Sequence, residues 1–410
     1  MFVVKHGSYF SKSTVTVYLS LLLLVGCQVV PVFKPTAVLP TRSSPLDTPA
    51  TTTCTPSLTP AFSLTETPIP LPTISPTTLP TAALLTPVVK KTDRIAFLSF
   101  RDGNWGLYVM DADGSNVLRL TDNKTEVSRF SWSPDGTRIA FAAQRYGQNS
   151  VIYAVDADGR NLIQLTDNAE ENRNPSWSPD GRRIAFTFSS AGEIHVMDVD
   201  GSNVAKLTDF GENGYAPQWS PDGSRIAFFS HWRSCQSEIY VVDVAGGDPI
   251  QLTTSRWTLP GTPTPVGVWS AEPNWSPDGK RITFMSSRDD RILRIYSVSA
   301  DGGEPARITW GSCRYPAWSP NGDRIAFSCT GEGGHDRGTY VVDPDGYNYL
   351  KLTDIASYGY IDWSPDGRRI TFESLDSYDS EGDIYVIDVD DNNVLRLTDN
   401  GRNKDPAWSP

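Results

Sequence analysis

The sequence has few histidines, and histidine is the commonest metal ligand among side chains. Its four histidines are His6, His195, His231 and His335. A histidine-based metal site needs several ligands that converge on one point, and four residues scattered over 410 positions give little material for one. The sequence therefore predicts no metal and no other cofactor.

A basic surplus and the familiar catalytic motifs are also missing. Lys and Arg number 36 against 48 Asp and Glu, the formal net charge is −12, and no run of Lys or Arg occurs. A chain of this charge does not suit nucleic acid or an anionic lipid surface. Neither the Gly-x-Ser-x-Gly of serine hydrolases nor a glycine-rich phosphate loop is present. No enzyme activity is predicted, because no complete catalytic constellation is found.

Near the start, one apolar run, Val15–Val25, follows Lys5 and Lys12 and is too short to span a bilayer comfortably. It ends in Leu24-Val25-Gly26-Cys27, which resembles the lipobox of bacterial lipoproteins. That resemblance implies cleavage before Cys27 and attachment of lipid to its sulfur. Residues 1–27 are therefore expected to be a lipoprotein signal peptide. An ordinary signal peptide and an uncleaved anchor are the alternatives.

Residues 28–91 are dense in proline and threonine, as in Thr65-Glu66-Thr67-Pro68. No apolar period of 2 or 3.6 residues survives there, so the segment is predicted to be a disordered stalk. A proline-rich chain extends by about 3.1 Å per residue, which gives a reach on the order of 190 Å. A stalk that crosses an envelope layer and a simple flexible tether are both compatible with this composition.

The rest of the chain is organised around the pentapeptide Trp132-Ser133-Pro134-Asp135-Gly136. Trp is a large apolar ring suited to burial at the end of a strand, and Pro, Asp and Gly favour a tight turn. An apolar run such as Arg138-Ile139-Ala140-Phe141 follows as the returning strand. Each copy is thus predicted to be the corner of a β-hairpin. The motif tryptophans are residues 132, 177, 219, 275, 318, 363 and 408, with Asn321 in place of Asp in the fifth copy.

The spacing of these tryptophans predicts the fold class. Successive steps are 45, 42, 56, 43, 45 and 45 residues. Each step holds a first strand ending in Trp, a second strand, a third strand such as Ile239–Asp243, and a fourth strand ending in Leu-Thr-Asp. A period of about 40–45 residues with four strands is the signature of a propeller blade. We therefore expect an all-β, seven-bladed β-propeller of four-stranded antiparallel blades over residues 92–410.

The ends of this repeat predict how the ring closes. The domain begins with a second strand at Ile95 and finishes with a first strand at Trp408. An open stack of blades gives no reason for such complementary ends. We expect the C-terminal strand to complete the N-terminal blade, with Ala407-Trp408 beside Ile95-Ala96.

Trp-Ser-Pro-Asp-Gly-x-Arg-Ile-Ala-Phe, followed by Ile-Tyr-Val-Val-Asp and Leu-Thr, resembles the TolB-type, WD-repeat-like β-propeller family over essentially all of residues 92–410. The resemblance implies the fold and a binding or scaffold role in the cell envelope. The family's namesake has a smaller α/β domain before its propeller, where this chain has the stalk, so its partners are not carried over. Oligogalacturonate lyases of similar fold rely on a histidine-rich metal centre, which this chain does not match.

Length variation falls in the connections from second to third strand and from fourth to first strand. Both emerge on one face of a propeller, which we call the long-loop face, and long loops on a rigid scaffold are the usual place for binding. Trp, Tyr and Arg are favoured interface anchors, and aromatic rings also suit sugars. A plainer interpretation of any single ring is that it caps a blade. The candidate binding residues are Trp105, Tyr146, His231, Trp232, Arg233, Trp257, Trp269, Arg288, Trp310, Tyr358 and Tyr360.

The Asp-x-Asp-Gly turns, such as Asp111/Asp113 and Asp343/Asp345, invite a calcium interpretation. A helix-loop-helix calcium loop spreads its ligands over twelve residues with glycine at the sixth. Here glycine comes fourth, where a tight hairpin needs positive φ, so a structural turn is predicted. His195 takes the third-strand tyrosine position and is expected to be a packed or edge residue.

The cysteines fit an exported protein. Cys313 precedes the first strand of one blade and Cys329 follows its second strand, so the two come nearly opposite across the hairpin at Asn321-Gly322. We expect a Cys313–Cys329 disulfide. Cys235 is left unpaired.

Together these features predict an exported lipoprotein, periplasmic or extracellular, whose monomeric propeller binds a protein or glycan through its long-loop face. Its contact with membrane is limited to the lipid anchor, and no nucleic acid is bound. Two alternatives remain open. One is a polysaccharide-active, lyase-like enzyme that uses the same face, with His231 and His335 aided by nearby acids. The other is a structural spacer in an envelope complex.

Overall fold

The computed structural model divides the chain into two units, Met1–Val88 and Val89–Pro410, and all described residues belong to the second. The structure describes residues 93–145, 147–167, 169–188, 192–208, 213–232, 236–254, 269–289, 291–331, 335–357, 359–374 and 382–410, without the side chains of residues 213, 231, 232 and 236. The expected signal peptide, the lipid site at Cys27 and the expected stalk over 28–91 lie outside these residues.

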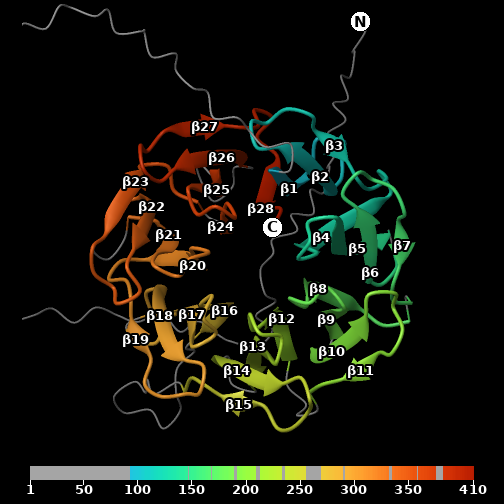
Figure 1. Ribbon diagram of the computed structural model, residues 1–410, viewed down its shortest axis with the longest axis horizontal. Helices are drawn as coiled ribbons and strands as arrows, with labels where there is room; N and C mark the ends of the chain where they lie inside the picture. Colours follow the sequence, from blue (N-terminus) through green and yellow to red (C-terminus); the bar gives the residue numbers. More distant parts are fainter. Residues whose placement is uncertain are drawn as a thin grey trace, which may run out of the picture. The chain divides into compact units, whose positions relative to one another are not determined.

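The described residues form seven four-stranded antiparallel sheets arranged in a ring, with the first strand of each sheet nearest the centre (Figure 1). The predicted all-β, seven-bladed propeller is confirmed. From the centre outward the strands are, in blade 1, β28 (Asn403–Trp408), β1 (Arg94–Ser99), β2 (Gly106–Asp111) and β3 (Leu118–Arg119); in blade 2, β4 (Thr125–Trp132), β5 (Arg138–Arg145), β6 (Val151–Asp156) and β7 (Ile163–Gln164); in blade 3, β8 (Asn172–Trp177), β9 (Arg183–Phe188), β10 (Glu193–Asp198) and β11 (Ala205–Lys206).

The remaining four blades follow the same plan. They are, in blade 4, β12 (Asn213–Trp219), β13 (Arg225–Trp232), β14 (Gln236–Asp243) and β15 (Ile250–Gln251); in blade 5, β16 (Ser270–Trp275), β17 (Arg281–Ser286), β18 (Arg294–Ser299) and β19 (Ala306–Arg307); in blade 6, β20 (Cys313–Trp318), β21 (Ile325–Cys329), β22 (Gly338–Val342) and β23 (Leu350–Thr353); in blade 7, β24 (Ile361–Trp363), β25 (Arg369–Ser374), β26 (Asp383–Asp388) and β27 (Val394–Arg396).

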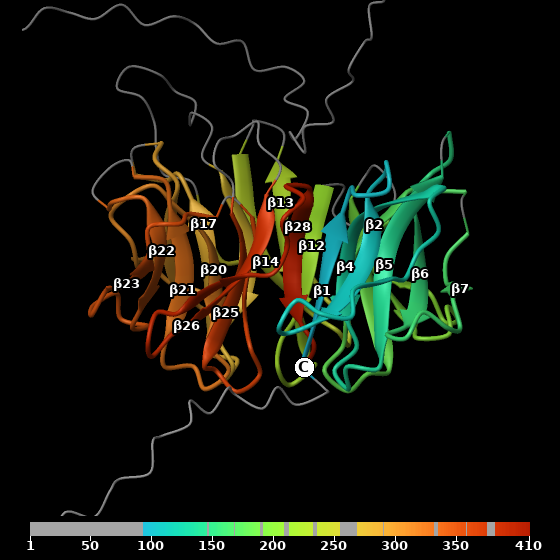
Figure 2. The same cartoon turned by 90° about the horizontal axis from the view of Figure 1, so that it is seen from above.

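The C-terminal strand closes the ring in the predicted register. Ile95 pairs with Trp408 and Ala96 pairs with Ala407, and Figure 2 shows β28 beside β1. The Ser409 N–H also donates to the Arg94 carbonyl at 2.8 Å. Residues more than 300 positions apart thus form one blade, and β28 supplies the inner strand that blade 1 would otherwise lack.

Packing between blades depends on the motif tryptophans, which are buried at the ends of the inner strands. In several blades the indole N–H donates to a carbonyl on the inner strand of the preceding blade, so the polar atom of a buried ring is satisfied. An Arg that begins the second strand lies over the next blade's indole, as Arg369 does over Trp408 at 4.7 Å. These indole bonds join Trp132 to Ala407, Trp219 to Ser176, Trp275 to Gln218 and Trp363 to Ala317, at 3.0–3.2 Å.

Within a blade, a buried Phe of the second strand packs against a ring of the third strand. Phe97 and Tyr108 stack with centroids 5.7 Å apart, and Phe327 and Tyr340 with centroids 5.6 Å apart. In blade 3 His195 holds the tyrosine position, buried beside Phe188 at 4.4 Å, as expected for a packed residue. The aromatic layer is therefore a repeated part of the core.

Cys313 and Cys329 are directly opposite on β20 and β21 and are joined by a disulfide. Both are fully buried, at the end of the hairpin away from its Asn321-Gly322 turn. The bond therefore fixes the two inner strands of blade 6 at the end where long connections leave the blade.

Ring closure gives a stability prediction. Trp408→Ala removes a buried indole at the seam and should lower the free energy of unfolding by about 3–5 kcal/mol. Denaturant unfolding of the full chain measures this. Trp310→Ala, which removes an indole that is 58% exposed, is the matched control and should change stability by only about 0.5 kcal/mol. Equal losses in both variants would argue against a structural seam at Trp408.

The disulfide gives a second prediction. Neither Cys313 nor Cys329 should react with an alkylating reagent in the native protein unless a reductant is present, as peptide mass mapping would show. Replacing both by Ala should lower the free energy of unfolding by about 2–4 kcal/mol under oxidising conditions, because the crosslink restricts the unfolded chain. Labelling of both thiols without reductant would disprove the pairing.

Candidate functional site

The seven inner strands surround a cavity of about 380 Å³ at the centre of the ring. Its lining takes one residue from every blade at the same place, three positions before the motif tryptophan. This set, which we call the channel ring, is Arg129, Asn174, Ala216, Glu272, Tyr315, Tyr360 and Asp405.

A bulge in the inner strand turns most of these residues toward the cavity. Where proline follows the channel-ring residue, the pairing register shifts at that point, and proline has no N–H that the ladder would lose. Arg129 and Tyr360 precede Phe130 and Ile361 instead, and β24 pairs without a shift. Positive φ values of 49° to 54° mark the bulged positions Asn174, Ala216, Glu272, Tyr315 and Asp405.

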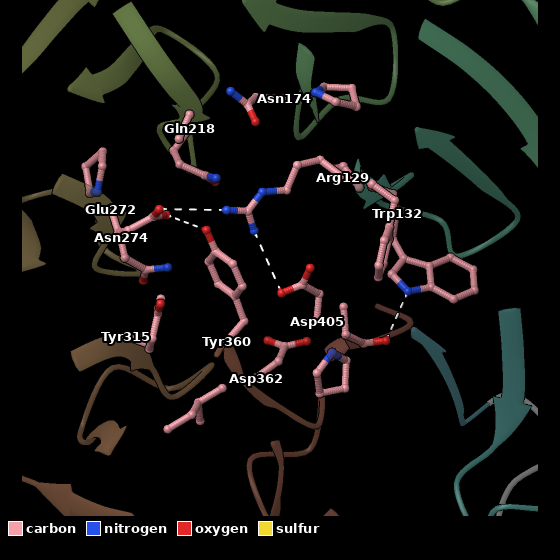
Figure 3. Close-up of a pocket in the computed structure, with 18 of the residues that line it drawn as sticks. Arg129, Trp132, Asn174, Gln218, Glu272, Asn274, Tyr315, Tyr360, Asp362 and Asp405 are labelled. Carbon is pink, nitrogen blue, oxygen red and sulfur yellow. Dashed lines mark hydrogen bonds and ion pairs between the residues drawn. The ribbon is translucent and has the colours of Figure 1, made fainter. Parts of the chain in front are cut away.

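Arg129 reaches across the cavity from blade 2 (Figure 3). Its guanidinium lies 4.4 Å from the centre of the Tyr360 ring and 3.9 Å from carboxylate oxygens of both Glu272 and Asp405. The Tyr360 hydroxyl donates to Glu272 at 2.6 Å. Burial alone would lower the pKa of Arg129, but Tyr360, Asp405 and Glu272 outweigh burial and raise that pKa, so the guanidinium stays charged.

Two more carboxyl groups lie beside this cluster. Asp362 accepts the backbone N–H groups of Trp363 at 3.0 Å and Trp408 at 2.8 Å, and burial raises the pKa of its carboxyl to about 6. Glu373 accepts the Asp405 N–H at 2.9 Å, and burial, with the nearby Asp405 charge, raises the pKa of Glu373 to about 8. A Cβ at Gly359 would come within 2.0 Å of the Glu373 carboxylate, so glycine leaves the room that this carboxyl occupies.

The cavity therefore carries an excess of acid. Its lining holds one cation, Arg129, and three carboxyl groups, those of Glu272, Asp362 and Asp405. Carboxylates that face a concave, partly desolvated space attract cationic groups. The amides of Asn174, Gln218 and Asn274 add hydrogen-bonding capacity to the same lining. This arrangement suits binding of a polar group with positive charge.

The structure distributes the predicted face residues over different environments. Tyr360 lies in the cavity, not on an exposed loop. Trp105 packs at the seam, edge-on to Phe100 at 5.6 Å with Lys404 over its ring at 4.2 Å. The remaining three described candidates are Arg288, over the rings of Phe284 and Tyr296; Trp269, half-buried beside the core of blades 4 and 5; and Trp310, which is exposed.

Most of the other predicted binding residues have side chains that lie outside the described part of the structure. His231 and Trp232 end the backbone of β13, and their side chains are not described. His335 is described; it accepts the Trp310 N–H at 3.4 Å and does not line the cavity. Outside the described residues lie Tyr146, Arg233, Trp257 and Tyr358.

Apart from Tyr360, the residues of the channel ring were not predicted from the sequence. Arg129, Glu272 and Asp405 lie in inner strands, whereas the sequence predicted binding residues in the connecting loops. Their common distance from the motif tryptophan was the available signal, because every copy of a repeat points the same position in the same direction.

The Asp-x-Asp-Gly turns use their carboxylates internally. Asp111 accepts from Asn116 at 2.6 Å and Asp343 from Asn348 at 2.7 Å, and both asparagines have positive φ. The backbone N–H of Ser115 donates to Asp113 at 2.9 Å. These contacts support the structural interpretation of the turns. In the part of the chain that the structure describes, no three His, Cys, Asp or Glu side chains are grouped as a metal site would need.

A closed ring of four-stranded blades around a polar central cavity defines a propeller repeat protein. A family model described as TolB beta propeller domain matches residues 87–213 and 153–410. The chain belongs to this family, as the motif resemblance implied.

Curated relatives include the Tol-Pal system protein TolB of Bordetella pertussis, 32% identical over 211 residues, which are 52% of this chain and 36% of that protein. TolB of Syntrophotalea carbinolica is 44% identical over 48 residues, 12% of this chain and 11% of that protein. The chain thus spans about a third or less of the length of these relatives.

Solved structures of similar fold include TolB proteins and an enzyme. TolB from Acinetobacter baumannii has a TM-score of 0.50 at 20% identity, covering 77% of this chain and 66% of that one. An oligogalacturonate lyase from Vibrio parahaemolyticus has a TM-score of 0.56 at 15% identity, covering 74% and 84%. At such identities the likeness shows the fold alone.

Among the described residues, no helix has the length and apolar character needed to cross a membrane.

The buried Glu373 carboxyl gives a pH prediction. Its pKa is raised from 4.5 to about 8 in the folded state, so it favours folding at low pH, and that contribution is lost as the pH rises through about 8. Glu373→Gln cannot ionise. The stability of the variant relative to wild type should therefore increase between pH 5 and pH 8.5, measured by urea unfolding at both values. A difference that stays constant with pH would contradict the raised pKa.

Proposed function

We propose that this chain is a non-catalytic binding module that receives a cationic segment of a protein partner at its central cavity. The observation that carries the proposal is the channel ring, in which Glu272, Asp405 and Tyr360 surround a single cation, Arg129, and leave an acidic excess. An incoming Lys or Arg side chain would find carboxylates already in place.

The long-loop face is the surface through which such a partner would approach. Its connections vary in length while the blades beneath them keep one plan. Variable loops on a rigid ring allow specificity to change without cost to the core. The partner would thus be selected by the loops and anchored by the cavity.

A place in the cell envelope is part of the same proposal. The N-terminal segment carries the features of a lipoprotein signal, with Cys27 as the lipid site, and residues 28–91 have the composition of a stalk. Curated relatives are named as Tol-Pal system proteins, which agrees with partner binding in an envelope complex. The propeller over residues 92–410 would then be held outside the cytoplasm by its anchor.

The test is binding of defined peptides to the full chain. N-acetylated hexalysine and hexaglutamate serve as probes, and isothermal titration measures their affinity at low and moderate salt. We expect hexalysine to bind and hexaglutamate not to bind. Glu272→Gln with Asp405→Asn should weaken hexalysine binding at least tenfold, because this pair removes two charges from the cavity.

A matched pair of exposed acids controls for overall charge. Asp158→Asn with Asp301→Asn changes the net charge by the same amount on the outer surface, where isolated ion pairs contribute little. That variant should bind hexalysine within about twofold of wild type. If both double variants lose affinity equally, binding depends on net charge and not on the cavity.

A further inference from the structure

A second candidate site lies at the junction of blades 5 and 6, apart from the central cavity. Trp310 stands in the connection between β19 and β20, on the long-loop face, and 58% of its surface is exposed. At the same place in the sequence five other repeats carry the Asp of Leu-Thr-Asp: Asp122, Asp167, Asp209, Asp354 and Asp399. An exposed indole therefore replaces a carboxylate at a position where the fold does not need an apolar residue.

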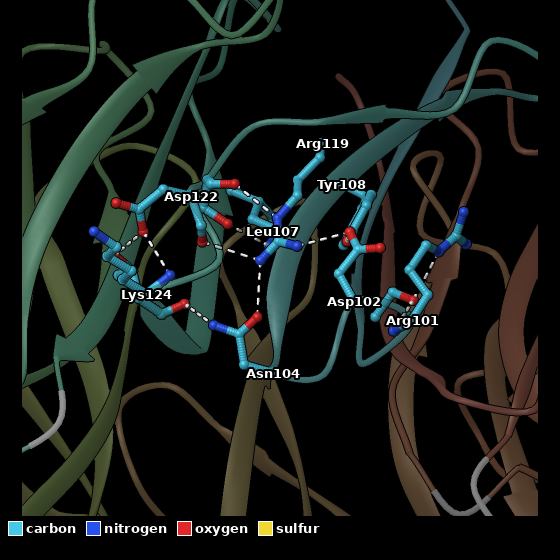
Figure 4. Close-up of polar contacts among 11 residues, drawn as sticks. Arg101, Asp102, Asn104, Leu107, Tyr108, Arg119, Asp122 and Lys124 are labelled. Atoms are coloured by element: carbon cyan, nitrogen blue, oxygen red, sulfur yellow. Dashed lines mark hydrogen bonds and ion pairs between the residues drawn. The ribbon is translucent and has the colours of Figure 1, made fainter.

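The network beneath Trp310 occurs elsewhere in the ring without a tryptophan. In blade 1, Arg119 pairs with Asp102 at 2.7 Å, and Asp102 accepts the Tyr108 hydroxyl (Figure 4). The corresponding residues of blade 5 are Arg307 and Asp289, paired at 3.0 Å, with Tyr296 beside them. Blade 1 holds the same arrangement with Asp122 in the tryptophan position. Trp310 is thus not required to build the network.

Trp310 is held as a fixed platform. The Arg307 guanidinium lies 3.6 Å from the centre of its ring and covers one face of the indole. Its backbone is fixed on both sides, because its N–H donates to His335 at 3.4 Å and its carbonyl accepts from Arg294 at 2.8 Å. With one face covered and more than half of the residue exposed, the opposite face of the ring is presented to solvent.

The surroundings of the indole favour a sugar over an apolar protein anchor. Arg307 lies against Trp310, Asp289 pairs with Arg307, and His335 accepts the Trp310 N–H, so hydrogen-bond donors and acceptors of the kind that hydroxyl groups require lie close to the indole. Protein hot spots are instead found in well-packed, desolvated pockets whose surrounding contacts exclude water. Among the described residues, the only other exposed large aromatic, Tyr347, lies on the turn between β22 and β23, at the opposite face.

We propose that Trp310 is a stacking platform for one pyranose ring of a β-linked glycan. Glucose and N-acetylglucosamine units in β-1,4 linkage have equatorial substituents, so their axial C–H groups form a flat apolar surface that matches the free indole face. The Arg307–Asp289 pair and His335 contact the hydroxyl groups at the rim. This site shares no residue with the cavity, so the proposal does not rest on the function proposed above.

The test is titration of the full chain with cellotetraose and chitotetraose by isothermal calorimetry. Wild type should bind at least one of them. Trp310→Asp, which installs the residue found on the same network in blade 1, should weaken binding at least tenfold, as should Trp310→Ala. Trp310→Phe keeps an aromatic face and should retain binding within about fivefold. Far-UV circular dichroism and thermal unfolding establish that each variant is folded.

Two controls make the result specific. Tyr347→Ala removes an aromatic ring of similar exposure from the opposite face and should leave the affinity unchanged. Glu272→Gln with Asp405→Asn should also leave it unchanged, which separates this site from the cavity. Failure of folded wild type to bind either sugar, or equal binding by wild type and Trp310→Asp, would overturn the proposal.

Discussion

The burial of one tryptophan between each pair of blades is the interaction on which this structure depends. A blade of four short strands has two apolar faces, and neither can be covered from within the blade. The indole at the end of the inner strand fills the space toward its neighbour. In four blades its N–H donates to a carbonyl of the preceding blade, and in several an arginine covers the ring. Since every such contact needs a further blade, the arrangement is satisfied only when it returns to its start. Trp408 and β28 supply that return.

Closure has a consequence for the centre of the molecule. Inner strands that repeat one register must point the same sequence position at the same axis, whatever residue the position holds. Arg129, Glu272, Tyr360 and Asp405 are separated by up to 276 positions, yet they meet because each stands three residues before its tryptophan. The fold constrains the tryptophan and the strand, and leaves the channel ring free to vary. Function can therefore be placed there at little cost to the core.

The sequence predicted those features of the fold that follow from the repeat of the motif tryptophan. The repeated tryptophan predicted seven blades, and the unmatched ends predicted the pairing of Ile95-Ala96 with Ala407-Trp408. The cavity was not predicted, because it depends on a backbone bulge that periodicity does not describe. A proline two residues before the motif tryptophan, such as Pro217 or Pro406, was the feature of the sequence that could have indicated the bulge. For the loops, residue type did not separate an exposed ring such as Trp310 from a packed one such as Trp105.

The polar cluster in the cavity is hard to explain as a stabilising device. Ion pairs in the interior add little net stability even where they keep a group charged, and the two contacts of Arg129 are both 3.9 Å long. The apolar cores of the blades do not include this polar cluster, since they are built mainly from the second and third strands and the motif tryptophans. Glu373 and Asp362 add to the cost, because burial raises the pKa of each carboxyl. An arrangement that costs stability and lies where the fold permits free choice is best explained by what it binds.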